Sequence, residues 1–171
     1  MAMYIEWRAS CSDCFRDGRL AGWGGSDPIS SWYGVTVNGE GRVTHLNLAG
    51  KRIHGLILPE IGNLTELVVC DFSDNGMRGD IPSEIGNLSK LTLLQLCDNQ
   101  LSGSIPESIG NLRSLEFFTV ERNNLSGRIP PEVIALRAMI EIDGYHRDPV
   151  GGGLVPNHPH RYSRRGRLFV D

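Results

Sequence analysis

Residues 91–112 read LTLLQLCDNQLSGSIPESIGNL, and variants of this string precede and follow it at intervals of 24 residues. Seven apolar columns recur in register over four copies. The first two columns hold Val43, Leu67, Leu91, Leu115 and Met139, and Leu46, Cys70, Leu94, Phe118 and Ile142; the other five begin at Leu48, Ile53, Ile57, Ile61 and Leu64. One copy cannot bury its own apolar face, so the copies must stack. The sequence therefore predicts a solenoid of four full coils and a partial fifth.

The same repeat predicts the local structure of each coil. The L-x-x-L-x-L part ends in alternation of period two, which predicts one short strand per coil, and stacking pairs these strands in parallel. An inward asparagine recurs at 75, 99 and 123, where its amide can satisfy backbone groups that the turn leaves unpaired. Glycine recurs at 55, 79, 103 and 127, which predicts a turn with positive φ. In the IGNL part, Ile and Leu stand three residues apart, which predicts a 3₁₀ or helical turn on the outer side.

The pattern LxxLxLxxNxLxGxIPxxIGNLxx over residues 43–143 resembles the plant-type leucine-rich repeat. Receptor-kinase ectodomains and polygalacturonase-inhibiting proteins carry such repeats. The resemblance implies an α/β repeat fold, a right-handed superhelix with a parallel sheet of one short strand per repeat on the concave face and 3₁₀ or irregular turns on the convex face. It also implies that ligands dock on the concave face.

The sequence outside the repeat predicts three further segments. Residues 1–21 are expected to be a loose N-terminal segment and residues 22–42 an N-terminal cap rich in large apolar side chains. The cap resembles the family's CxWxGVxC cap, but Ile29, Ser30 and Val37 stand where cysteines occur, as in short cysteine-free algal and microbial members. Residues 144–171 lack periodicity and carry many Gly, Pro and Arg residues, which predicts a disordered basic tail. An uncapped last coil would be open to self-association.

Composition narrows the range of partners and sites. The net charge is −3, which does not indicate a nucleic-acid partner, and no apolar run predicts membrane insertion. Neither the Cys11–Cys14 pair nor His158 and His160 has the further ligands of a metal site, and no cofactor is expected. No secretory signal is visible at residue 1. This predicts a cytoplasmic protein if the N-terminus is complete, and by resemblance an extracellular or membrane-associated one if it is truncated.

Candidate binding residues are those that alternate with the inward columns, because they face solvent on the concave side. Val69, Leu93 and Phe117 form an apolar strip beside a polar, partly acidic column, and such a mixture suits ligand docking. The candidates are His45, Asn47, Val69, Asp71, Leu93, Gln95, Phe117, Thr119, Glu121, Arg122, Glu141 and Asp143.

These observations predict a non-catalytic recognition module, in signalling or defence-type recognition, that binds a protein, peptide or glycan. A truncated or structural fragment without its own ligand is an alternative, because the ends of the chain lack the repeat. An enzyme built on Asp71, Asp74 and Asp98 is a minor alternative. No nucleophile elbow, P-loop or HExxH motif occurs, and an open surface does not provide the desolvated cleft that catalysis needs.

Overall fold

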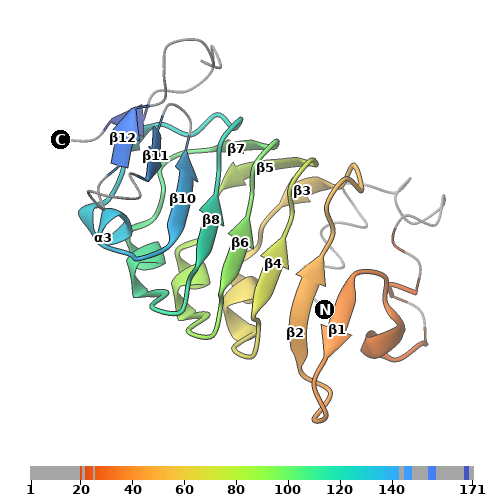
Figure 1. Ribbon diagram of the computed structural model, residues 1–171. Coiled ribbons are helices and arrows are strands. Elements are labelled where there is room, and N and C mark those ends of the chain that lie inside the picture. The colour runs from red at the N-terminus through yellow and green to blue at the C-terminus, as the bar shows by residue number, and fades with distance from the viewer. Residues whose placement is uncertain are drawn as a thin grey trace.

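The computed structural model describes residues 20, 22–24, 26–142, 145–147, 154–156 and 168–169. Within them the chain winds into stacked coils, and each coil adds one strand to a large sheet (Figure 1). The strands of this sheet lie in the order β1 (Val35–Val37), β2 (Val43–Asn47), β4 (Val69–Asp71), β6 (Leu93–Gln95), β8 (Phe117–Thr119), β10 (Met139–Ile142), β11 (Tyr145–Arg147) and β12 (Leu154–Pro156). The pairs from β2 to β10 are parallel, as the repeat predicts.

The opposite side of each coil carries a second sheet and a short helical turn. The second sheet consists of β3 (His54–Leu56), β5 (Gly76–Asp80) and β7 (Gln100–Ser102), all parallel, and the sequence did not predict it. The predicted helical turns are 3₁₀ turns in three coils, whereas the next coil has a short α-helix. They are η2 (Pro59–Asn63), η3 (Ser83–Asn87), η4 (Glu107–Asn111) and α3 (Pro131–Ile134).

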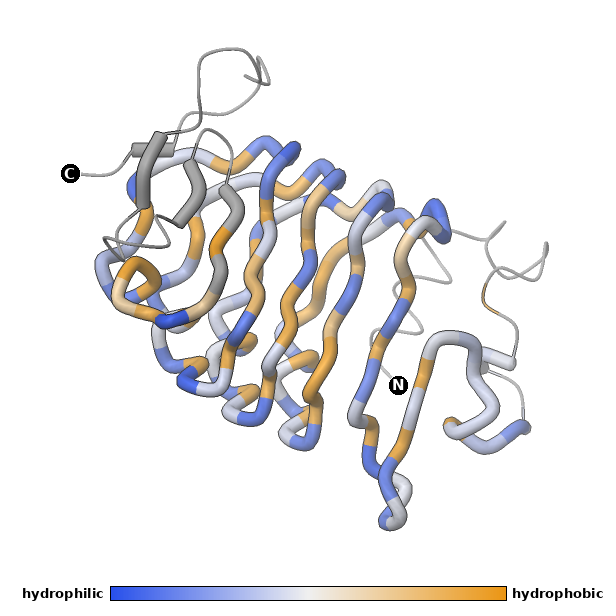
Figure 2. The backbone as a smooth tube through the Cα atoms, in the orientation of Figure 1, coloured by the Kyte–Doolittle hydropathy of each residue, from blue (hydrophilic) through white to orange (hydrophobic). Residues whose placement is uncertain are grey.

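The seven apolar columns form one continuous core between the two sides. Every column member from Val43 to Leu136 is buried except Leu64, which is partly buried and packs against the core. The inward positions of the strands are apolar and buried, and apolar stretches recur from coil to coil (Figure 2). The prediction of an inward column every 24 residues is therefore confirmed for these four coils.

A ladder of three asparagines, Asn75, Asn99 and Asn123, ties neighbouring coils together behind the large sheet. Asn99 Oδ1 accepts the N–H of Met77, 3.0 Å away. Asn99 Nδ2 donates to the carbonyls of Phe72 at 2.8 Å and Leu96 at 3.2 Å. The other two asparagines repeat these contacts one coil away. The predicted role of the inward asparagine is confirmed, and each amide also bridges to the preceding coil.

Glycine is required at two places in the repeat, once for a turn and once for close approach of neighbouring coils. Gly55, Gly79, Gly103 and Gly127 all have positive φ, which confirms the predicted turn. On the helical side, a Cβ added to Gly86 would lie 2.5 Å from the carbonyl oxygen of Ser108 in the next coil. Gly62 and Gly110 are equally close to the coils that follow them, so glycine in the IGNL part is required by coil spacing.

The segment before the first repeat closes the N-terminal end of the sheet. After the 3₁₀ turn η1 (Ile29–Ser31), strand β1 pairs antiparallel with β2 and covers its edge. Trp23 and Trp32 stack with ring centroids 5.0 Å apart, and Trp23 Nε1 donates to the Tyr33 carbonyl at 2.8 Å. Leu20 is buried in the core. Cys11, Cys14 and the rest of the expected loose segment lie outside the described residues.

The fifth coil differs from the 24-residue register that we assigned to it. Strand β10 pairs with β8 so that Ile140, not Ile142, stands opposite Phe118, and Ile140 is buried. Phe118 lies six positions after Leu112, but Ile140 lies only four positions after Leu136. The connection between helix and strand is therefore two residues shorter, and the columns that placed Met139 beside Leu115 and Ile142 beside Phe118 are wrong.

The C-terminal part continues the sheet where we expected a disordered tail and an open coil. Strand β11 pairs antiparallel with β10, and β12 pairs antiparallel with β11. Strand β13 (Leu168–Phe169) pairs in parallel with β9 (Gly127–Arg128). The expectation of disorder does not hold for these three stretches, and the rest of residues 143–171 lies outside the described residues. Strand β11 therefore occupies the edge of β10.

Replacing Asn99 by Ala is expected to lower the free energy of unfolding by about 3 kcal/mol, because buried carbonyls and the Met77 N–H lose their partner. Asn124→Ala is the matched control, since Asn124 is exposed and one residue from the ladder. Urea unfolding followed by circular dichroism measures both. Equal midpoints for the two variants would contradict a structural role for the ladder.

Gly86→Ala is expected to destabilise the chain by about 2 kcal/mol, because its Cβ would press on the backbone of the next coil. Gly39→Ala is the control, since nothing lies within 4 Å of a Cβ added there. Thermal unfolding of both variants measures the difference. A Gly86→Ala protein as stable as Gly39→Ala would show that the coils are not in close contact.

Candidate ligand-binding face

The side of the large sheet that points away from the core carries two rows of side chains, and we call it the strand face. Strand pairing places His45, Val69, Leu93 and Phe117 opposite one another in an apolar row. Asn47, Asp71, Gln95 and Thr119 form a parallel polar row two residues further along each strand. The asparagine ladder and the inward columns hold these strands in register, so the rows are straight.

Two predicted candidates do not extend these rows as expected. Because of the shorter fifth coil, Glu141 stands opposite Thr119 and belongs to the polar row, not to the apolar row beside Phe117. The predicted position of Glu141 in the apolar row is wrong. Asp143 lies outside the described residues.

The apolar row becomes more exposed toward the C-terminal coils. Val69 and Leu93 are half-buried, whereas the Phe117 side chain is 43% exposed. An exposed aromatic ring beside two partly exposed aliphatic side chains gives a ligand apolar area to cover. His45 ends the row, with its Nδ1 2.9 Å from the hydroxyl of Thr44.

Hydrogen-bonding groups of the polar row are available to a ligand. Asp71 Oδ1 accepts the N–H of Ser73 at 3.0 Å and its hydroxyl at 2.6 Å. Within the part of the chain that the structure describes, Asp71 Oδ2 makes no hydrogen bond, and neither do the side-chain amides of Asn47 and Gln95. Asp71 and Gln95 are half-buried and Asn47 is exposed. Asp71 Oδ2 and the amides of Asn47 and Gln95, which make no internal hydrogen bond, are suited to external recognition.

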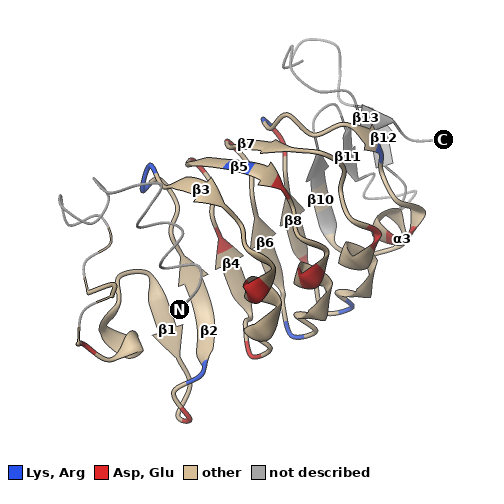
Figure 3. Cartoon of the chain, turned by 180° about the vertical axis from the view of Figure 1, so that it is seen from behind, with Lys and Arg blue, Asp and Glu red and all other residues tan. Residues whose placement is uncertain are grey.

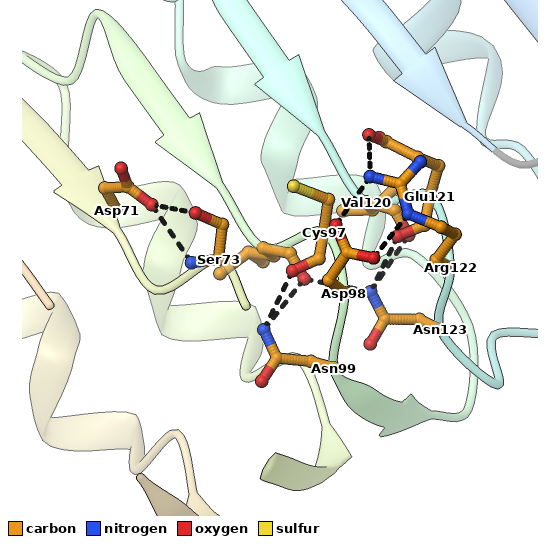
Figure 4. A network of polar contacts seen from close by, with 10 residues as sticks. Asp71, Ser73, Cys97, Asp98, Asn99, Val120, Glu121, Arg122 and Asn123 are labelled. Atoms are coloured by element: carbon orange, nitrogen blue, oxygen red, sulfur yellow. Dashed lines mark hydrogen bonds and ion pairs between the residues drawn. The ribbon is translucent and has the colours of Figure 1, made fainter. Parts of the chain in front are cut away.

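A charged cluster lies beside the C-terminal end of the polar row (Figure 4). Arg122 binds Asp98 through two nitrogens, with Nη2 2.5 Å from Oδ2, and also contacts Glu121 at 3.3 Å. This bidentate bond holds the pKa of the Asp98 carboxyl below its usual range, and it raises the pKa of Arg122. Asp98 and Arg122 have φ of 54° and 56°, which directs both side chains outward at the end of their strands. Both are substantially exposed, so the pair orients the groups more than it stabilises the fold.

Sequence reasoning did not include Asp98 among the binding candidates, although it named Arg122. The two residues are 24 positions apart, and that spacing could have indicated contact between adjacent coils. The Cys97 thiol, in the next outward column of this face, was also not among the binding candidates. Burial raises the pKa of Cys97 to about 11, and the Thr119 hydroxyl beside it partly offsets this.

The described residues contain no group of three or more His, Cys, Asp or Glu side chains arranged to bind a metal ion. A shallow cavity of about 210 Å³ lies between the β1–β2 hairpin and the end of the first coil, lined by Gly41, Arg42, Val43, Asn63, Leu64, Thr65 and Glu66. None of the strand-face carboxylates borders this cavity. Among the described helices, none is long and apolar enough to cross a membrane.

Comparison with known proteins identifies the repeats. A family model described as Leucine Rich Repeat matches residues 66–88 and 90–112. The chain is 36% identical over 83 residues to the LRR receptor-like serine/threonine-protein kinase EFR of Arabidopsis thaliana. This match covers 48% of this chain and 8% of EFR. The match agrees with the solenoid fold and identifies these two coils as leucine-rich repeats, similar to those of a plant receptor-like kinase.

Solved structures agree with this fold. The BIR2 ectodomain from Arabidopsis thaliana superposes with a TM-score of 0.66 at 26% identity, covering 86% of this chain and 84% of that one. The LRR ectodomain of the Arabidopsis receptor kinase HAESA, in complex with an N-terminally extended IDA peptide hormone, gives a TM-score of 0.63 at 26% identity, covering 74% of this chain and 22% of that one. The chain thus spans less than a quarter of EFR or of the HAESA ectodomain.

Cys97 is expected to react with iodoacetamide about a hundredfold more slowly than an ordinary cysteine at pH 8, because its raised pKa leaves little thiolate. The rate should rise about tenfold from pH 8 to pH 9, compared with about threefold for a free thiol. Mass spectrometry follows the modification in a protein that carries Cys11→Ser and Cys14→Ser. Adding Cys97→Ser to this protein shows which part of the modification occurs at Cys97. A rate that levels off near pH 8.5 would contradict the desolvated setting of this thiol.

Proposed function

We propose that the chain is a non-catalytic recognition module whose strand face binds a peptide segment of a protein ligand in receptor-type signalling. The main support is the pair of rows on strands β2 to β8, where partly exposed apolar side chains run beside hydrogen-bonding groups that no described contact uses. Such a mixture favours macromolecular recognition over simple solvation of the surface.

The comparisons favour the same function. HAESA, whose ectodomain resembles this chain over 74% of its length, is described in complex with a peptide hormone. In EFR, a receptor-like kinase, the matched region is about the size of three repeats. Binding of a ligand by this chain is therefore inferred from a shared scaffold together with its own face. The defence or signalling context remains part of the proposal.

Peptides fit the strand face better than the other ligands that the sequence suggested. Side-chain amides such as Asn47 and Gln95 can both donate to and accept from a peptide backbone. The apolar row can accommodate peptide side chains, whereas a glycan offers hydroxyl groups and little apolar area. For an enzyme, the carboxylates of Asp71, Asp74 and Asp98 lie on an open surface rather than in the described cavity.

The combined substitution Phe117→Ala and Asp71→Arg is expected to weaken peptide binding at least thirtyfold, because it removes apolar contact area and reverses a charge on the same face. Peptides selected from a phage-displayed library against the full chain provide the probes, and fluorescence anisotropy measures their affinity. The control is Leu56→Ala with Glu60→Arg, two exposed residues on the opposite side of the solenoid.

Circular dichroism must show that both double variants are folded. Unchanged affinity of the Phe117→Ala, Asp71→Arg protein would contradict binding at the strand face. Failure of the full chain to select any peptide would favour the alternative of a structural fragment without its own ligand.

A further inference from the structure

The charge of the strand face indicates which peptides it would select, if the proposed function holds. Strands β2, β4, β6 and β8 contain no Lys or Arg. Asp98, Glu121 and Arg122 together carry a net charge of −1, and Asp71 and Asp74 add −2, so the group beside β4, β6 and β8 totals −3. Lys51 and Arg52, which follow β2, carry +2 at the N-terminal end of the face. Carboxylates also occur on the opposite side, in strand β5 and on the helical turns of successive coils (Figure 3).

Three basic side chains follow these strands, and each is already engaged. Lys51 Nζ lies 4.0 Å from the centre of the Tyr33 ring, Arg122 is bound to Asp98, and Arg52 also has a partner. None of them is bonded to the Asp71 carboxylate, whose side-chain hydrogen bonds among the described residues are with Ser73 alone. A cationic ligand group is therefore the complement that Asp71 lacks.

Asp71 is also oriented in advance for such a group. Its Oδ1 is held by the backbone N–H and the hydroxyl of Ser73, which fixes the carboxylate while Oδ2 makes no bond within the described chain. Because the side chain is half-buried and already ordered, binding costs little further side-chain entropy. A charge-assisted hydrogen bond to Oδ2 is the strongest contact that this row can offer.

The neighbouring side chains define what lies beside the cation. Gln95 and Thr119 continue the polar row from Asp71 on strands β6 and β8, while Leu93 and Phe117 lie in the apolar row on those strands. Adjacent strands are about 4.8 Å apart and residues rise about 3.3 Å along a strand, so Asp71 and Phe117, two strands and two residues apart, are separated by about 12 Å. An extended chain covers that distance in about three to four residues.

We propose that the strand face selects an extended cationic peptide. An Arg or Lys side chain of this peptide pairs with Asp71. An aromatic or aliphatic side chain about three residues away packs on Leu93 and Phe117. Gln95, between the two, is placed to bond the peptide backbone.

Synthetic peptide pools of defined charge test this pairing. Each pool consists of fluorescein-labelled nonapeptides with a fixed Phe and, three residues from it, a fixed Arg, Gln or Glu, while the other positions vary among Ser, Thr, Ala and Asn. Anisotropy titrations use the full chain, Asp71→Asn, and the control Glu60→Gln, an exposed carboxylate on the opposite side. Asp71→Asn is nearly isosteric and keeps an acceptor for Ser73.

The Arg pool is expected to bind the unaltered chain about tenfold more tightly than the Gln pool, and the Glu pool more weakly than both. Asp71→Asn should reduce the affinity for the Arg pool to that for the Gln pool, and Glu60→Gln should leave the preference unchanged.

Three results would overturn the inference. Equal binding of all pools by the unaltered chain contradicts cation selection but leaves peptide binding in place. An Arg preference that persists in Asp71→Asn contradicts the assignment to Asp71. Binding of none of the pools, together with no peptide from the phage library, contradicts the proposed function as well.

Discussion

The contacts of each inward asparagine connect two adjacent coils, and the rest of the structure depends on this bridge. A coil turns sharply after its strand, and its backbone carbonyls and N–H groups there are shielded from water. The Asn99 amide bonds the carbonyls of Phe72 and Leu96 and the N–H of Met77, and Asn75 and Asn123 make the equivalent bonds. Without such partners these groups would be buried and unpaired, which is costly.

The strand face is a consequence of that bridge. Because the coils are held in one register, residues 24 positions apart stand opposite one another, and side chains between the inward columns form straight rows. The scaffold places few demands on these outward residues. Polar side chains such as Asn47, Asp71 and Gln95 are therefore free to differ from coil to coil, and their chemistry sets what the surface can bind.

Much of the fold could be predicted because its physical causes recur at a fixed period. The burial of the apolar columns, the asparagine contacts and the glycines with positive φ follow from the repeat. The second sheet was missed because its strands, such as β5 with the sequence GMRGD, pair through backbone groups and show no alternation. In the fifth coil, Met139 and Ile142 fit the period by chance, and only strand pairing shows that Ile140, not Ile142, stands opposite Phe118 in the core.

The candidate site was predicted to a similar extent. Alternation with the inward columns identified both rows, including Phe117 and Asp71, before any contact was known. What could not be read from the sequence is which polar groups are already used: Arg122 is bound to Asp98, whereas Asp71 keeps one oxygen without a partner in the described chain. These differences arise from side-chain geometry between coils, which the spacing alone does not determine.

Native-state hydrogen exchange of the Met77 and Leu101 amides tests the bridge between coils most directly. These N–H groups donate to Asn99 and Asn123 respectively, 3.0 and 2.9 Å away, and both are expected to be strongly protected in the unaltered chain. In Asn99→Ser the account predicts that Met77 loses protection by a far larger factor than Leu101. If Met77 and Leu101 lost protection by the same factor in Asn99→Ser, the claim that the asparagines hold the coils in register would be contradicted.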